Sequence, residues 1–208
     1  KPRMVYISNT TEIGTQYTKA ELEALSRICR QNGLLLFLDG ARLGAALTSS
    51  ANDLTMADIA RLTDVFYIGG TKNGALFGEA VVILNPALDQ DFRYMIKQHG
   101  GMLAKGWLLG IQFETLFADG LFYEMASHAT VMADKLRKGL EKRGVSFYSQ
   151  SVSNQIFPIF SDETIEMLSK DFSFNIQARM DETHQAVRLV TSWATREEAV
   201  DAFLVALD

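Results

Sequence analysis

The sequence predicts an α/β protein with a mixed β-sheet flanked by helices and a small α+β unit at its carboxyl end. Three short apolar runs, at residues 4–8, 34–38 and 65–68, have the length of strands and alternate with amphipathic helical patterns. Strands joined in this way pair in parallel through right-handed crossovers. A fourth run, at 80–84, follows after a loop too short for a crossover helix, so we expect it to run antiparallel to its predecessor.

Two capping patterns place the helices between these strands. Thr18 and Glu21 have the spacing of a capping box, and an Asn-Gly pair closes the helix that they begin. Thr55 and Asp58 repeat the pattern ahead of a second helix that ends before the third strand. Between these units we expect residues 44–50, most of them small, to form a turn.

The middle of the chain is predicted to be helical. Asn85 and Pro86 have the order of a helix cap and a first helical residue, and a His-Gly-Gly-Met turn at 99–102 ends that helix. A long helical region is expected over residues 107–143, with an interruption at an Asp-Gly pair. A helical region of that length commonly links two domains or lies across a sheet.

From residue 145 the pattern changes to strand, strand, helix, strand, strand, helix. We expect strand pairs at 145–148 with 156–160 and at 174–178 with 186–190, and helices at 164–170 and from the Thr195 cap through 207. The predicted division of the chain is a large α/β domain (1–105), a connecting helical region (106–143) and a small α+β domain (144–208).

Composition favours a small-molecule partner. Net charge is −5 over 208 residues with no run of like charge, which argues against a nucleic-acid or lipid partner. No apolar run is long enough for a membrane span, and no signal-peptide pattern opens the sequence. The single cysteine, Cys29, suits a reducing, cytoplasmic location, and the Cys and His spacing predicts no metal site. Because the first strand begins almost at residue 1, we expect N-terminal sequence to be missing.

Candidate site residues follow the second and third strands. Asp39 ends the second strand, Arg42 comes three residues later, and Lys72 lies in a glycine-rich turn after the third. Ligands of α/β proteins bind at such strand ends. A lysine can condense with the aldehyde of pyridoxal phosphate while a carboxylate keeps the pyridine nitrogen protonated. The alternative for Lys72 alone is a solvated hairpin residue.

Four stretches resemble the low-specificity L-threonine aldolases of the β-eliminating lyase group. They are DGARLG (39–44), DVFYIGGTKNG (64–74), HGGM (99–102) and VRLVTSWATREE (187–198). The resemblance runs in the right order along nearly the whole chain. It implies the aspartate-aminotransferase-like fold, of which this chain would supply the C-terminal part, and pyridoxal phosphate as cofactor.

The resemblance also implies roles for individual residues. Lys72 matches the lysine that carries the cofactor, and Asp39 matches the partner of the pyridine nitrogen. Arg42 matches an arginine near the cofactor that contacts the substrate carboxylate. Arg188 matches a second carboxylate-binding arginine from the small domain, a task that suits a planar guanidinium. On spacing alone, Arg188 could equally be a surface residue of an edge strand.

Three further positions are weaker candidates. Asn9 follows the first strand, where relatives carry Asn-Thr-His near the cofactor, but this chain continues differently. Thr71 could donate its hydroxyl to the cofactor phosphate or serve only the turn. Relatives read GGGMRQ where this chain reads GGMLAK, so Leu103 replaces their arginine. Lys105 could supply that charge for the substrate or face solvent.

The resemblance implies aldol cleavage of a β-hydroxy-α-amino acid, threonine or allo-threonine, to glycine and an aldehyde. It implies that this chain lacks the phosphate-binding loop and the histidine that stacks on the cofactor ring, so that activity of the 208 residues is impaired. The alternatives are β-elimination or transamination on the same cofactor, and a non-catalytic piece without cofactor. Family analogy further implies a homo-oligomer, a dimer or tetramer.

Overall fold

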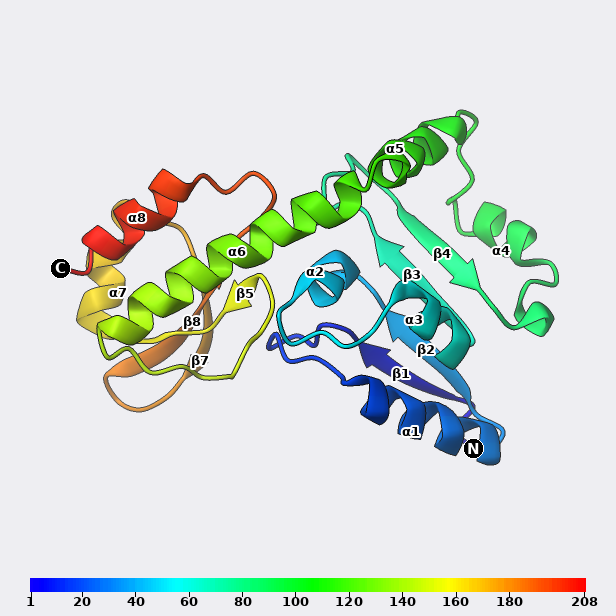
Figure 1. Ribbon diagram of the computed structural model, residues 1–208, viewed down its shortest axis with the longest axis horizontal. Coiled ribbons are helices and arrows are strands. Elements are labelled where there is room, and N and C mark those ends of the chain that lie inside the picture. Colours follow the sequence, from blue (N-terminus) through cyan, green and yellow to red (C-terminus); the bar gives the residue numbers. More distant parts are fainter.

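A computed structural model describes residues 1–208 as two sheets joined by one long helix (Figure 1). The first sheet has the strand order β1-β2-β3-β4, with β1 and β2 parallel, β2 and β3 parallel, and β4 antiparallel to β3. The mixed sheet predicted from the sequence is therefore confirmed. Its strands are β1 (Met4–Ser8), β2 (Leu35–Asp39), β3 (Val65–Gly69) and β4 (Glu79–Ile83).

Helices cover one face of this sheet. Both predicted capping boxes are formed, by Thr18 with Glu21 at α1 (Lys19–Gln31) and by Thr55 with Asp58 at α3 (Met56–Leu62). The strands turn alternate residues toward these helices, and Leu36, Leu38 and Phe66 are almost fully buried there. The opposite face leaves Tyr6 and Val81 about half exposed.

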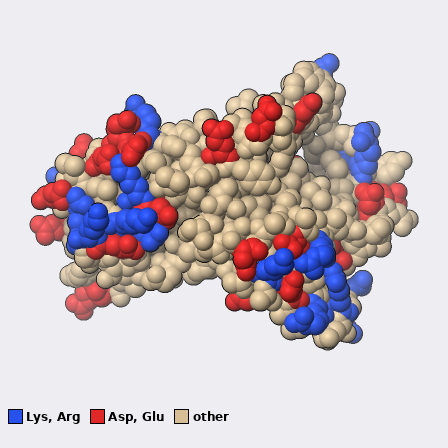
Figure 2. Space-filling view, viewed as in Figure 1, with Lys and Arg blue, Asp and Glu red and all other residues tan.

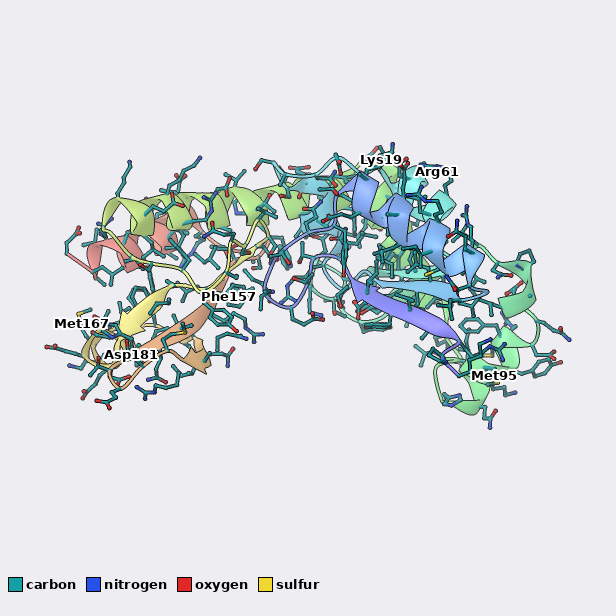
Figure 3. The ribbon with its side chains drawn as sticks, turned by 90° about the horizontal axis from the view of Figure 1, so that it is seen from below. Lys19, Arg61, Met95, Phe157, Met167 and Asp181 are labelled. Atoms are coloured by element: carbon teal, nitrogen blue, oxygen red, sulfur yellow. The ribbon has the colours of Figure 1, made fainter.

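A three-way charge contact joins α1 to α3 at the surface. In Figure 3, Lys19 and Arg61 lie close together on these two helices. Both contact the Asp58 carboxylate, with Nζ and Nη2 at 2.8 and 3.0 Å from its Oδ1. The lysine and arginine hydrogen bonds, together with the Thr55 cap, hold the pKa of Asp58 well below its usual value. The contact ties the two crossover helices together.

The prediction of a turn at residues 44–50 was wrong, because Leu43–Thr48 form the helix α2. Its small residues let it pack closely on α6 (Leu121–Lys142). A Cβ placed on Gly44 would lie 2.9 Å from the Ala126 Cβ. Close helix approach, rather than chain reversal, explains the small side chains.

Helix α6 belongs to both hydrophobic cores. Its first turns contribute Phe122 to the core of the first sheet, and its later turns contribute Leu136 and Leu140 to the second core. At 22 residues it is about 33 Å long. The predicted interruption separates it from α5 (Trp107–Ala118). The predicted helix after Asn85 is in fact two, η1 (Pro86–Leu88) and α4 (Phe92–Gln98), because Asp91 takes a left-handed conformation between them.

The second sheet packs against α6 and α8. Its central strand β8 pairs antiparallel with β5, β6 and β7. The pairing predicted for 174–178 with 186–190 is confirmed, whereas the 145–148 segment forms only one isolated bridge, from Phe147 to Pro158. The elements are β5 (Gln155–Ile156), β6 (Ile159–Ser161), α7 (Asp162–Leu168), β7 (Asn175–Arg179), β8 (His184–Val190) and α8 (Glu197–Val205).

Two helix starts in this half differ from prediction. Helix α7 begins at Asp162 because the Ser161 side chain caps it. Helix α8 begins at Glu197, and Thr195 is not its cap: the Thr195 hydroxyl instead accepts a hydrogen bond from the Ser192 N–H at 2.8 Å. The Thr195 side chain therefore stabilises the turn before α8 instead of capping the helix, the role that the sequence pattern predicted.

A polar seam joins the loop after β1 to the second half of the chain. The Ser149 hydroxyl donates to the Ile13 carbonyl at 2.6 Å, and the Val152 N–H donates to the Gly14 carbonyl at 3.0 Å. Gly14 has a φ of +78°, and a Cβ on it would lie 1.9 Å from the Ser151 Oγ. Only glycine meets both demands.

We expect Gly14→Ala to lower the free energy of unfolding by about 2 kcal/mol or more, because a left-handed backbone and an overpacked contact both become unfavourable. Gly33→Ala is the control: its φ is +62°, but no atom lies within 4 Å of the added Cβ, so it should cost only about 1 kcal/mol. Urea unfolding of both variants measures the difference. Equal losses would contradict the close contact at Ser151.

Charged side chains of both signs are interspersed on the face seen in Figure 2, mostly over the two ends of the molecule. The middle of this face has few charged side chains, and those at its upper margin are acidic. None of the helices is both long enough and apolar enough to cross a membrane.

Candidate active site

The candidate site begins where β2 and β3 end. Asp39 is the last residue of β2, and Lys72 lies in the turn after β3. The two strands are parallel neighbours, so both residues lie at the carboxyl end of the strands, on the same side of the sheet. Lys72 is exposed, and its positive charge favours the ionised form of Asp39. The site therefore places a free amine near a carboxylate.

Two tyrosine hydroxyls and one backbone amide bind the Asp39 carboxylate. Tyr67 donates to Oδ1, Tyr6 donates to Oδ2, and the Ala41 N–H donates to Oδ1 at 2.9 Å. Partial burial alone would raise the pKa of Asp39, but these donors and Lys72 together hold it below its ordinary value. Asp39 is ionised at neutral pH and still has acceptor capacity for another donor.

Glu79 anchors the turn that carries Lys72. Its Oε2 accepts from the Gly70 N–H at 2.5 Å, and its Oε1 accepts from the Thr71 hydroxyl at 3.3 Å. On the other side of Lys72, the buried Asn73 side chain donates to the Phe122 carbonyl of α6 at 2.8 Å. The turn is thus fixed on both sides while the lysine itself stays exposed. Thr71, a candidate phosphate ligand, lies in this turn, and its hydroxyl donates to the Glu79 carboxylate.

Arg42 immediately precedes α2, and its side chain makes no hydrogen bond or ion pair. Its Nε is buried without a partner. Burial, and secondly the nearby charge of Arg188, lower the pKa of Arg42, although Asp39 acts in the opposite direction. A partly buried guanidinium whose Nε has no acceptor is unfavourable unless an anion binds it.

Arg188 reaches the same region from β8. Its Nη2 donates to the Asn175 Oδ1 at 3.0 Å, from the position directly opposite on β7, and its Nε is also buried without a partner. No carboxylate pairs with it. The structure therefore places near each other two arginines that are far apart in sequence. Neither has a negatively charged partner.

A small cavity lies beside Arg42 and Lys72, and Asp39 and Arg188 do not line it. Arg42, Lys72 and Asn73 line it with Asn154, whose buried Oδ1 also lacks a hydrogen-bond partner, and with Ala126 from α6. The cavity lies where the first sheet, α6 and the segment before β5 meet. Residues from both halves of the chain thus contribute to one site.

The side chains of Asn9 and Lys105 do not contact these groups. Asn9 is only 1% exposed, and its Oδ1 accepts from the Tyr17 N–H at 3.4 Å, so its side chain organises the loop after β1. Its N–H also donates to the Asp39 carbonyl at 3.0 Å. Lys105 is exposed in the segment between α4 and α5, which Figure 1 shows beyond the β4 edge of the sheet.

Sequence reasoning missed three residues that contact the site: Tyr6, Tyr67 and Glu79. The alternation of side chains along the strands could have indicated the two tyrosines. Tyr67 lies two residues after Val65, the partner of Phe37, and Asp39 lies two residues after Phe37. Once the register is known, both side chains must share one face of the sheet. Glu79 begins β4 and pairs with Gly69 beside the lysine turn.

The fold is that of the aspartate-aminotransferase-like enzymes. An aspartate aminotransferase double mutant of Thermus thermophilus has a TM-score of 0.71 at 16% identity, with 99% of this chain and 56% of that chain covered. The model of the beta-eliminating lyase family matches residues 1–163, and the chain belongs to that family.

Two threonine aldolases show the similarity in more detail. A solved structure of threonine aldolase from Leishmania major is 54% identical with a TM-score of 0.97, covering 99% of this chain and 60% of that chain. The low specificity L-threonine aldolase of Pseudomonas sp. (strain NCIMB 10558) is 34% identical over 206 residues, 96% of this chain and 57% of its relative. The chain thus spans somewhat over half the length of these relatives.

Proposed function

We propose that the protein cleaves a β-hydroxy-α-amino acid, threonine or allo-threonine, to glycine and an aldehyde with pyridoxal phosphate as cofactor. The observation that carries the proposal is the convergence of Asp39, Lys72 and two arginines without a carboxylate partner at one end of the first sheet. The similarity to threonine aldolases supports the choice of reaction.

The donor set fits pyridoxal phosphate. Asp39 is ionised and retains acceptor capacity for a protonated ring nitrogen, and Lys72 offers an exposed amine in a fixed turn. When bound, the cofactor withdraws electrons from the α-carbon of the substrate. Asn9 and Thr71 are secondary candidates for cofactor contacts. Asn9 would act through the loop whose backbone hydrogen-bonds to Asp39, and Thr71 would act through its hydroxyl.

Arg42 and Arg188 would hold the substrate carboxylate. Each has a buried Nε without an acceptor, and a carboxylate can accept two parallel hydrogen bonds from a guanidinium. An anion between them would also relieve the repulsion between the two positive charges. Fixing the carboxylate orients the α-carbon and its substituents relative to Lys72. Lys105, in the exposed segment between α4 and α5, is proposed only as an additional positive charge for the substrate.

Product analysis tests the reaction. We expect L-threonine or L-allo-threonine to give glycine and acetaldehyde in equal amounts, measured by amino-acid analysis and by an aldehyde-coupled assay. Serine and cysteine should give little pyruvate. Pyruvate as the main product would favour β-elimination, and a cofactor-dependent exchange of amino groups would favour an aminotransferase.

The length of the active protein is part of the proposal. Because this chain spans 57% and 49% of the two curated relatives, we infer that the 208 residues by themselves are less active than a protein of the relatives' length. A non-catalytic piece without cofactor is the limiting case. We further propose that the protein acts as a homo-oligomer in the cytoplasm.

A further inference from the structure

The Asp39 carboxylate lies beside an aromatic row on the open face of the first sheet. Tyr6 and Phe37 stack with ring centroids 5.3 Å apart and an interplanar angle of 9°. The Phe37 and Tyr67 ring centroids are 6.3 Å apart, with the rings tilted by 52°. The three rings come from β1, β2 and β3, the three parallel strands. Phe37 thus holds two tyrosine rings, one on each side.

The row aims both hydroxyls at one carboxylate. Tyr6 pairs with Phe37, two residues before Asp39, and Tyr67 lies beside Asp39 on the next strand. The Tyr6 hydroxyl donates to Oδ2 of Asp39, and both the Tyr67 hydroxyl and the Ala41 N–H donate to Oδ1. With donors on both oxygens the carboxylate cannot rotate freely, so its remaining lone pairs have a fixed direction.

The contacts are electrostatically coupled. The hydrogen bond to Asp39, followed by partial burial, raises the pKa of Tyr6 to about 12. Burial and then the same carboxylate raise the pKa of Tyr67 further above its ordinary value. In return, both hydroxyls lower the pKa of Asp39 against the effect of burial. A bound cofactor would bury Asp39 more, which would increase the need for these donors.

We propose that Tyr6 and Tyr67 are positioning residues that hold Asp39 ionised and oriented toward the cofactor's ring nitrogen. The inference rests on the proposed function, because it assigns the ring nitrogen as the partner of Asp39. The tyrosines do not themselves touch the reacting atoms. Their effect is on the affinity for pyridoxal phosphate and on the pH range over which it binds.

The first test uses the protein without cofactor. Tyrosine ionisation is followed by ultraviolet absorbance between pH 9 and 13 in the wild type and in Asp39→Asn. We expect two of the six tyrosines to ionise late in the wild type, Tyr6 at about pH 12, and to ionise earlier in the variant. An unchanged titration would show that the hydroxyls do not bind Asp39 in solution and would overturn the proposal.

The second test measures binding of pyridoxal phosphate to the cofactor-free protein by fluorescence titration. The double variant Tyr6→Phe/Tyr67→Phe keeps both rings and the stacking but loses both hydroxyls. We expect its Kd to rise about tenfold at neutral pH. The acid limit of binding should move to higher pH, because the Asp39 carboxyl loses two donors while Lys72 and Arg42, the cations near it, remain.

Tyr94→Phe is the matched control, since Tyr94 is 74% exposed on α4 and its hydroxyl makes no hydrogen bond. It should bind pyridoxal phosphate as the wild type does. If the wild type binds the cofactor and the double variant binds it equally well with the same acid limit, the positioning role is wrong. If the wild type itself binds none, the proposed function fails first, and the positioning role fails with it.

Discussion

Replacing Lys72 with alanine is expected to abolish the yellow colour of the cofactor-loaded protein near neutral pH and to lower turnover by about 1,000-fold or more. The reason is that Lys72 is the only amine at the strand end beside Asp39. Because Lys72 is exposed and its turn is fixed by Glu79 and Asn73, the free energy of unfolding should change by no more than about 0.5 kcal/mol.

Visible absorbance and mass spectrometry after borohydride reduction measure the covalent attachment. In the wild type, reduction should fix the cofactor to the peptide that contains Lys72, and in the variant it should fix none. Lys170→Ala is a suitable control, because Lys170 is an exposed lysine after α7 with no ion pair. Retention of the absorbance band in the Lys72 variant would refute the assignment of Lys72.

The parts of the fold that the sequence predicted correctly are those that depend on local chemistry. The capping boxes at Thr18 and Thr55 use groups within one helical turn, and the four strands of the first sheet follow from short apolar runs. The turn predicted at residues 44–50 failed because α2 is held by α6, a helix far away in sequence. Small residues favour turns locally and close helix packing in the folded protein, and sequence alone does not separate the two.

The same distinction applies to the site. The positions of Asp39 at the end of β2 and of Lys72 in the turn after β3 were predictable, because strand ends and glycine-rich turns are visible in the sequence. Tyr6 and Tyr67 were not, because which side chains share a face with Asp39 depends on strand register. The proximity of Arg42 and Arg188 requires the two halves of the chain to be placed together. Family resemblance suggested both arginines, but their missing partners are visible only in three dimensions.

Because Arg188 has no carboxylate partner, we expect Arg188→Met to weaken substrate binding without lowering the stability of the ligand-free protein. Losing a charge-assisted hydrogen-bonding group costs about 3 kcal/mol in substrate binding, so kcat/KM should fall about 100-fold, mainly through KM. Without ligand, the same change removes a cation that lies near Arg42 and has an unpartnered Nε. The free energy of unfolding should therefore stay equal or rise.

Steady-state kinetics and urea unfolding of the same preparation measure the two effects. Arg179→Met is the matched control, because Arg179 lies on the neighbouring strand β7 and already has a carboxylate partner, Asp162, at 2.8 Å. It should leave KM unchanged while removing a surface ion pair. A ligand-free protein that is destabilised by Arg188→Met, with KM unaltered, would mean that Arg188 serves the sheet through Asn175 and that the carboxylate binds elsewhere. A stable variant with raised KM would mean that this cation is kept for its ligand despite its unfavourable effect on the free protein.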